Sequence, residues 1–202
     1  MTDNIDFIDR ETSLPDALSD MTLIKRQNPF DPLYKLQDIR ASEQKLEDLP
    51  EFPRILDVEL TNACNFKCVF CPYSFKKADM PKNFDIERHD KIFNYDLFKK
   101  IIDEGSMNKL MAIELGYNTE PLLYKKLVNA ISYAKGKGIA DIRMTSNGSK
   151  LTKIISKKLI EGGLTHLGVS LDAFSKETYK LMRASKLYEK VKNNILEFIE
   201  IR

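Results

Sequence analysis

The 202-residue sequence contains no tryptophan, only two histidines and only three cysteines. Its apolar runs are short, and none approaches the roughly 18–20 residues that a membrane-spanning helix needs. The N-terminus, Met-Thr-Asp-Asn-Ile-Asp, lacks the basic and apolar regions of a secretory signal peptide. Three clustered cysteines cannot form a disulfide framework, which needs separated pairs, and they suit a reducing compartment. We therefore expect a cytoplasmic protein without a membrane partner.

The charge balance is close to neutral. Apolar residues make up 43% of the chain, charged residues 31%, and the net charge is +2, values typical of a soluble globular protein with a substantial core. This net charge predicts no nucleic-acid partner. Residues 1–60 hold 14 Asp and Glu against 7 Lys and Arg, whereas residues 61–202 hold 16 against 25. We interpret the basic excess as solvated helix faces rather than as a surface for anionic ligands.

Two regions differ in pattern. Residues 1–52 contain one candidate helix over 36–46 and the pairs Asn-Pro, Asp-Pro and Leu-Pro, which interrupt regular structure. This pattern predicts a partly irregular N-terminal extension. From residue 53 onward strands and helices alternate, so 53–202 is predicted to be the core. Strands are expected at 55–60, 110–115, 139–145 and 165–171, and helices at 95–104 (ended by Gly105), 121–135, 151–161, 175–182 and 188–201. This order predicts an α/β fold of about four βα units, with a parallel sheet, right-handed crossovers and outer helices.

All three cysteines, Cys64, Cys68 and Cys71, follow the first strand within eight residues. Clustered thiolates suit zinc, Cu(I) or an iron–sulfur cluster. Structural zinc prefers four ligands, commonly in two Cys-x2-Cys pairs, and there is no second pair; His89 and His166 are the only histidines. An iron–sulfur cluster fits better, and three ligands would leave one iron of a cubane cluster open. A zinc-stabilised, non-catalytic binding module remains the alternative.

The Cys-x3-Cys-x2-Cys spacing after a strand, with Phe70 between the second and third cysteines and Pro72 after the third, resembles the radical S-adenosylmethionine (radical SAM) enzymes. The resemblance implies a [4Fe–4S] cluster and S-adenosylmethionine as cofactors, and an electron donor such as flavodoxin or ferredoxin. It implies oxidoreductase chemistry, in which a 5′-deoxyadenosyl radical abstracts hydrogen from a substrate. The fold it implies is a partial (β/α) barrel of six units, of which this chain holds about four, an N-terminal portion.

Polar residues at the strand ends match the family's cofactor positions. Glu120-Pro121 stands where the family has Gly-Gly-Glu-Pro, although Asn118 and Thr119 replace the glycines. Asn147, with Ser146 before it, is expected near the nucleoside; its Asn-Gly pair is also a turn signal in its own right.

Later residues complete the expected set. Alternation points Ser170 and Asp172 to the same side of the fourth strand, into the barrel. The resemblance implies that they approach the ribose and the methionine carboxylate, that Arg183 pairs with this carboxylate, and that Phe70 lies against the adenine or shields the cluster. Tyr73 is a weaker candidate for the same face, Lys67 is expected in solvent, and His166 is expected to be structural.

The Cys-Pro-Tyr and Glu-Pro-Leu-Leu segments resemble members with a SPASM or Twitch domain, which act on peptides, sugars or other small metabolites. The substrate is therefore an unidentified small molecule or peptide. A sheet of four strands is expected to expose an edge and an apolar inner face. An inactive, truncated cluster-binding fragment is accordingly a further alternative.

Overall fold

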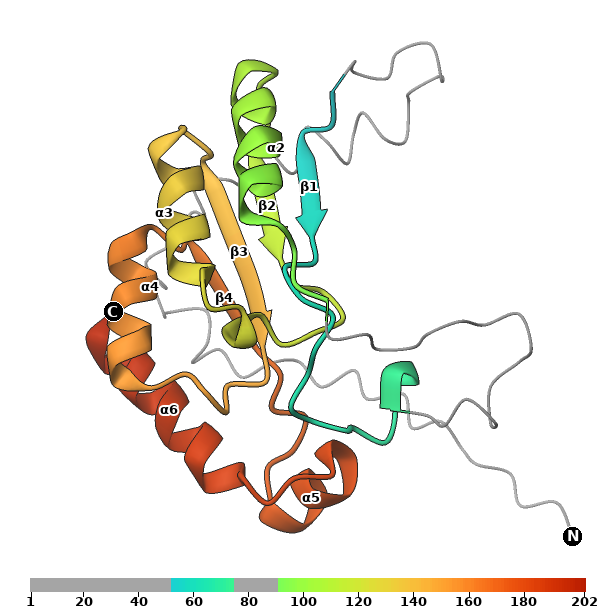
Figure 1. The fold of residues 1–202 in the computed structure, drawn as a ribbon. Helices are drawn as coiled ribbons and strands as arrows, with labels where there is room; N and C mark the ends of the chain where they lie inside the picture. Colours follow the sequence, from blue (N-terminus) through green and yellow to red (C-terminus); the bar gives the residue numbers. More distant parts are fainter. Residues whose placement is uncertain (1–51, 75–90) are drawn as a thin grey trace, which may run out of the picture. The chain divides into compact units, whose positions relative to one another are not determined.

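The computed structural model describes residues 52–74 and 91–202, so the candidate helix over 36–46, His89 and nearly all of the predicted N-terminal extension lie outside the described residues. Four strands form one parallel sheet in the order β1-β2-β3-β4 (Figure 1). Their bounds are β1 Ile55–Val58, β2 Ala112–Leu115, β3 Asp141–Ser146 and β4 His166–Val169. The predicted fold, a partial barrel of four βα units, is confirmed.

The helices pack as neighbours in chain order along the sheet. Contacts join α2 to α3, α3 to α4, and α4 to α6, while α5 packs on α6 (Figure 1). No helix among the described residues is both long and apolar enough to cross a bilayer. The bounds are α2 Tyr95–Met107, α3 Leu127–Gly136, α4 Lys153–Gly162, α5 Lys176–Arg183 and α6 Tyr188–Ile201, with 3-10 turns η3 Pro72–Ser74 and η5 Pro121–Leu123.

Two predicted helix boundaries are wrong. The helix expected over 121–135 is divided, because Glu120 caps the short η5 turn and Tyr124 is extended (φ −79°, ψ 111°), so that α3 begins only at Leu127. Helix α2 continues through Gly105 to Met107. A Cβ at Gly105 would lie 2.6 Å from Leu110 Cδ2, so this glycine is required by packing and not by helix termination.

One face of the sheet forms the core. Alternation along the strands points Val58, Ile113, Leu115, Ile142 and Met144 toward the helices, and all five are buried in one apolar cluster. The same cluster includes apolar side chains from α2, α3 and α4, so burial of these helix stripes fixes the helices on this face.

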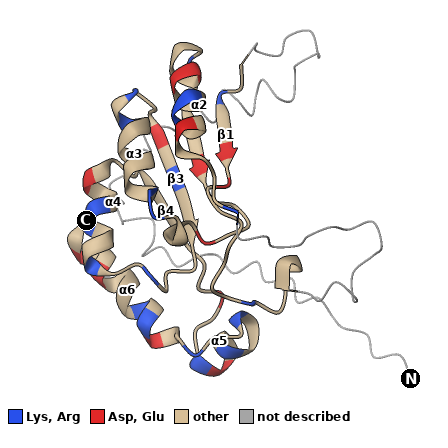
Figure 2. Ribbon diagram, viewed as in Figure 1, with Lys and Arg blue, Asp and Glu red and all other residues tan. Residues whose placement is uncertain are grey.

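The inner face of the sheet is polar, which corrects the expectation of an apolar one. The register aligns Asp57 with Glu114, Glu114 with Arg143, and Arg143 with His166, giving a row of charged and polar side chains across four strands. Figure 2 shows charged positions along the strands themselves. Arg143 Nε lies 3.6 Å from Glu114 Oε2, so charges on neighbouring strands are paired. These residues share one face because side chains alternate along each strand.

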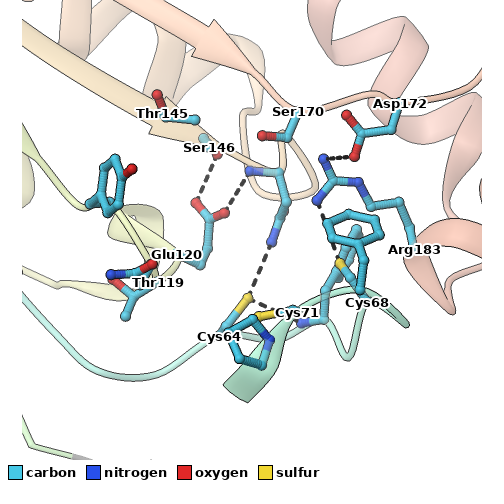
Figure 3. Close-up of a pocket in the computed structure, with 16 residues that line it drawn as sticks. Cys64, Cys68, Cys71, Thr119, Glu120, Thr145, Ser146, Ser170, Asp172 and Arg183 are labelled. Atoms are coloured by element: carbon cyan, nitrogen blue, oxygen red, sulfur yellow. Dashed lines mark hydrogen bonds and ion pairs between the residues drawn. The ribbon is translucent and has the colours of Figure 1, made fainter. Parts of the chain in front are cut away.

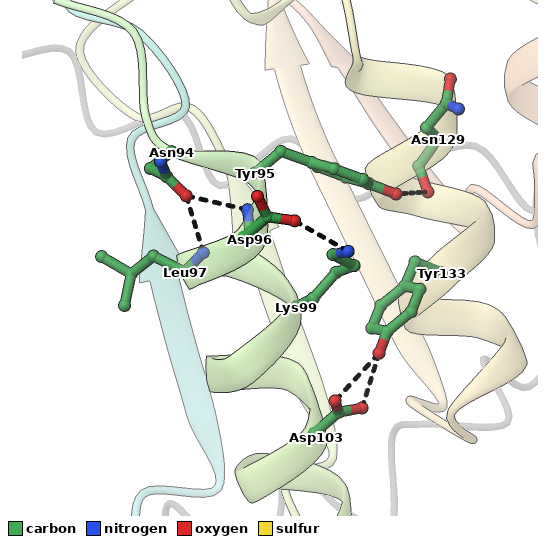
Figure 4. A network of polar contacts seen from close by, with 8 residues as sticks. All are labelled: Asn94, Tyr95, Asp96, Leu97, Lys99, Asp103, Asn129 and Tyr133. Carbon is green, nitrogen blue, oxygen red and sulfur yellow. Dashed lines mark hydrogen bonds and ion pairs between the residues drawn. The ribbon is translucent and has the colours of Figure 1, made fainter.

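Polar contacts add to the packing between α2 and α3 (Figure 4). Asn94 caps α2, because its Oδ1 accepts hydrogen bonds from the backbone N–H groups of Asp96 and Leu97. Tyr133 Oη on α3 donates to Asp103 on α2 at 2.8 Å, and Tyr95 Oη on α2 donates to the Asn129 carbonyl at 3.2 Å. These bonds fix the two helices beside the strands whose carboxyl ends form the site described next.

Candidate metal and cofactor site

The segment that carries the cysteines is anchored where it leaves the sheet. After β1 the chain leaves the sheet, and Thr61 forms an antiparallel bridge with Ile92. Phe93 N donates to the Leu60 carbonyl at 2.9 Å, and Asn62 N donates to the Lys91 carbonyl at 3.2 Å. This short ladder closes the base of the loop and directs its first part toward the carboxyl ends of the strands.

The three cysteines line one cavity (Figure 3). All are present as thiols, and Cys68 is buried whereas Cys64 and Cys71 are partly exposed. Cys71 N donates to the Cys68 carbonyl at 3.1 Å, a tight turn that brings these two residues together. Phe66 N donates toward Cys64 Sγ at 3.5 Å. The loop therefore turns its three sulfur-bearing residues toward one space, which Phe66, Phe70 and Pro72 of the same loop also line.

The cavity has a volume of about 380 Å³ and lies at the carboxyl ends of the strands, where parallel α/β folds bind their ligands. All nine residues predicted for the site line it: Cys64, Cys68, Phe70, Cys71, Glu120, Asn147, Ser170, Asp172 and Arg183. Lys67 is exposed, and neither Tyr73 nor His166 is among the lining residues. The structure thus brings the predicted residues together; their roles toward a cofactor remain predictions.

Glu120 is almost fully buried and bonds to protein groups. Its Oε1 accepts from Ser146 Oγ at 2.8 Å and from Leu122 N at 3.1 Å, and its Oε2 accepts from Asn147 N at 2.7 Å. Burial raises the pKa of this carboxyl above its usual value, and the hydrogen bonds oppose this change. Glu120 therefore ties the turn after β2 to the turn after β3.

A second polar link ties the cysteine loop to the turn after β3. Asn147 Nδ2 donates to Asn65 Oδ1 at 2.9 Å, and Asn65 Nδ2 donates to Ser149 Oγ at 2.9 Å. Asn147 Nδ2 also lies 4.0 Å from Cys64 Sγ. Asn65 and Ser149 were not predicted; their positions, between two cysteines and after an Asn-Gly pair, were the only signals in the sequence.

Arg183 is buried in the wall of the cavity next to Cys68. Its NH1 donates to Cys68 Sγ at 3.4 Å, and its NH2 forms an ion pair with Asp172. The guanidinium carbon lies 5.3 Å from the centroid of the Phe70 ring, a cation–π contact. Asp172 has φ of +55°, a left-handed conformation that Asp tolerates and that turns the chain away from the end of β4.

Tyr179 lies behind Cys68 and was not predicted from the sequence. It is fully buried in a small cluster with Phe66, Cys68 and Val191, and its ring meets that of Phe66 edge-on, with centroids 6.4 Å apart. Burial raises the pKa of its hydroxyl to about 12. Both Tyr179 Oη and Arg183 Nε are buried without a hydrogen-bond partner among the described residues.

The donor chemistry of the cavity fits an iron–sulfur cluster. Three sulfur ligands suit such a cluster. One of them, Cys68, accepts a hydrogen bond from Arg183 NH1 and packs in one cluster with Tyr179, and both of these residues carry a buried donor without a partner among the described residues. Across residues 52–74 and 91–202, no three His, Cys, Asp or Glu side chains already converge on a point where a single metal ion could sit. The three thiolates would bind different irons of such a cluster, so its binding would not require them to converge on one point.

The fold and the site together define a class of protein: a partial α/β barrel with a three-thiol cavity at the carboxyl ends of its strands. The family model for the radical SAM superfamily matches residues 58–201, and the chain belongs to this superfamily.

Individual relatives agree with this membership. The chain is 32% identical over 148 residues to a probable GTP 3′,8-cyclase of Methanococcus maripaludis, covering 73% of this chain and 46% of the relative. It is similar in fold to Streptococcus suis SuiB bound to its precursor peptide SuiA (TM-score 0.62, 18% identity, 85% of this chain and 36% of SuiB). It is also similar to BtrN in complex with AdoMet and 2-DOIA (TM-score 0.53, 22% identity, 63% of this chain and 49% of BtrN). The chain spans about half the length of the curated relatives it matches.

Proposed function

We propose that this chain holds a [4Fe–4S] cluster through Cys64, Cys68 and Cys71 and binds S-adenosylmethionine at the open iron, for hydrogen abstraction from a substrate. The observation that carries the proposal is the single cavity that joins the three thiols to polar groups from three strand ends. When bound, the cluster supplies one electron that cleaves the sulfonium to methionine and a 5′-deoxyadenosyl radical. The protein contributes ligation, orientation and exclusion of water.

Hydrogen bonds between loops are proposed to orient the cofactors. Glu120 holds Ser146 and the Asn147 backbone, and Asn147 in turn holds Asn65, which lies beside Cys64 in the sequence. In this proposal Glu120 contributes by fixing the turn that faces the nucleoside, because its carboxylate already accepts three protein hydrogen bonds. Asn147, which lies in that turn and lines the cavity, is proposed to approach the nucleoside.

The carboxyl end of β4 supplies the remaining contacts. Ser170 N donates to the Ser146 carbonyl at 2.9 Å, which places the Ser170 hydroxyl at the cavity. Ser170 and Asp172 are proposed to meet the ribose hydroxyls. Phe70, half exposed, is proposed to cover the adenine. Arg183, whose NH2 is paired with Asp172 and whose NH1 donates to Cys68 Sγ, is also proposed to approach the methionine carboxylate.

The substrate is proposed to be a small molecule or a peptide, and the electron to come from a flavodoxin or a ferredoxin. GTP is named for the relatives and a precursor peptide for SuiB. Among the described residues that line the cavity, the one cationic side chain is Arg183, which is paired with Asp172. The described cavity therefore offers no unpaired cation to a triphosphate, and we do not assign GTP as the substrate.

The test is anaerobic reconstitution of the full chain with iron and sulfide, followed by low-temperature EPR of the reduced protein. A [4Fe–4S]⁺ signal that changes on addition of S-adenosylmethionine is the expected result. A cluster signal that does not respond to the cofactor would identify an inactive cluster-binding fragment. Zinc retained with no uptake of iron would identify the zinc-stabilised binding module.

A further inference from the structure

Two residues with buried donors, Arg183 and Tyr179, lie against Cys68, and the proposed cofactor contacts do not use Tyr179. Arg183 NH1 already donates to Cys68 Sγ at 3.4 Å, so a positive charge faces one cluster ligand directly. Arg183 Nε and Tyr179 Oη are buried and have no hydrogen-bond partner among the described residues. A buried donor without a partner is costly, and its presence needs an explanation.

The two donors belong to one helix face. Tyr179 and Arg183 are four residues apart in α5, so their side chains lie one above the other. Tyr179 packs against Cys68 in the same buried cluster, and the Cys68 loop is fixed to the end of this helix because Val69 N donates to the Met182 carbonyl at 3.1 Å. Helix α5 is therefore attached to the cysteine loop by backbone as well as by side chains.

The surroundings keep the guanidinium on this side. Its other terminal nitrogen is held by Asp172, and its face lies over the Phe70 ring. Arg183 is only 8% exposed, so solvent screens its charge weakly. Reduction adds one negative charge to a cluster, and hydrogen bonds to its sulfur atoms together with nearby positive charge make that reduction easier.

We propose that Arg183 and Tyr179 are positioning residues that donate to the Cys68 side of the cluster and raise its reduction potential. This inference rests on the proposed function, because it requires the cluster to be bound. It gives Arg183 a role toward the cluster ligand in addition to any contact with the methionine carboxylate. Helix α5 then serves as a support that adjusts how readily the cluster accepts its electron.

The experiment is an EPR-monitored redox titration of the reconstituted full chain, performed without S-adenosylmethionine so that a lost cofactor contact cannot change the result. Arg183→Gln is expected to make reduction at least about tenfold less favourable, a fall of about 59 mV for a one-electron couple. Tyr179→Phe removes only the hydroxyl and is expected to cause a fall of about threefold. Arg183→Lys keeps the charge and is expected to restore most of the potential.

The control is Lys180→Met, which removes one positive charge from an exposed position of the same helix and is expected to leave the potential unchanged. The proposal is overturned if Arg183→Gln, with wild-type iron content, has the potential of this control. If Arg183→Gln does not retain its cluster, Tyr179→Phe decides, and a wild-type potential there overturns the proposal. A wild-type chain that takes up no iron overturns the proposed function as well, whereas a cluster that binds but has the same potential in all variants overturns only this inference.

Discussion

At the scale of single residues, burial separates groups that the sequence presents as equivalent. Cys68 is buried, its sulfur faces the Arg183 guanidinium, and it packs against Phe66, whereas Cys64 and Cys71 are partly exposed. The three cysteines thus differ in surroundings, although each is expected to bind one iron. We expect loss of any of them to leave too few ligands to hold the proposed cluster.

Cys68→Ala is expected to abolish cluster binding, with a loss of iron affinity greater than the roughly 10–100-fold that removal of an outer partner causes. The measurement is iron and sulfide content after reconstitution. Lys67→Ala, an exposed change in the same loop, is the matched control and should retain the full content. A Cys68→Ala protein with full iron and sulfide content would contradict the proposal that Cys68 is a cluster ligand.

Glu120 is expected to make stability depend on pH. Burial raises its pKa in the folded protein above the ordinary value of 4.5, so the folded state binds its proton more tightly than the unfolded state. The resulting contribution to the free energy of unfolding is present below pH 4.5 and is lost as pH rises through the folded-state pKa. The loss amounts to about 1.4 kcal/mol for each pH unit that separates the folded-state pKa from the unfolded-state pKa.

Glu120→Gln removes this dependence. Urea unfolding of both proteins from about pH 4.5 to 8 measures the difference between wild type and variant. As pH rises, the free energy of unfolding of the wild type is expected to fall relative to that of the variant. Glu161→Gln, at an exposed carboxylate of α4, is the control. A difference that stays constant, or that moves in favour of the wild type, would contradict the raised pKa.

At the scale of elements, apolar periodicity located the strands and helices but not all of their ends. The stripe over 121–135 was continuous in sequence, yet the Glu120 cap and the extended Tyr124 divide it. Gly105 was expected to end a helix, yet it lies inside α2. In both cases the decisive contact is made in the folded state, with Ser146 and Asn147 for Glu120 and with Leu110 for Gly105.

Gly105→Ala is therefore expected to destabilise the protein by about 1–3 kcal/mol, because the added Cβ would overlap the Leu110 side chain and overpack the core. Gly136→Ala in α3 is the matched control, since a Cβ there meets nothing within 4 Å. Helix propensity should make this second change stabilising by up to about 1 kcal/mol. Urea unfolding of both variants checks the prediction, which is contradicted if the two changes have effects of the same sign.

At the scale of the whole molecule, the sheet order leaves β1 and β4 with one unpaired edge each among the described strands. Unpaired strand edges are templates for association. The polar inner face reduces the apolar surface available for it, so the edges are the expected contact.

We expect the 202-residue chain alone to self-associate or to need a partner that covers an edge. His166→Lys, at an exposed position of β4, should reduce the associated fraction measured by light scattering. Ile154→Lys on the exposed side of α4 is the control for a general effect of added charge. A monodisperse wild-type monomer of 23.3 kDa that melts cooperatively would contradict this expectation.

The sequence by itself determined the features that depend on local spacing. Three thiols within eight residues and the alternation of strand and helix patterns predicted the cysteine site and the parallel α/β units, because side-chain period and ligand spacing are properties of short segments. The partial barrel and the other cavity residues were implied by the resemblance that these motifs carry. Only the tertiary structure decided which of these residues contact one another. It placed Tyr179 and Arg183 behind Cys68, buried Glu120 against Ser146, and aligned Asp57, Glu114, Arg143 and His166 across the inner face. These contacts join segments far apart in the chain, and their geometry is set by packing of the whole sheet and its helices.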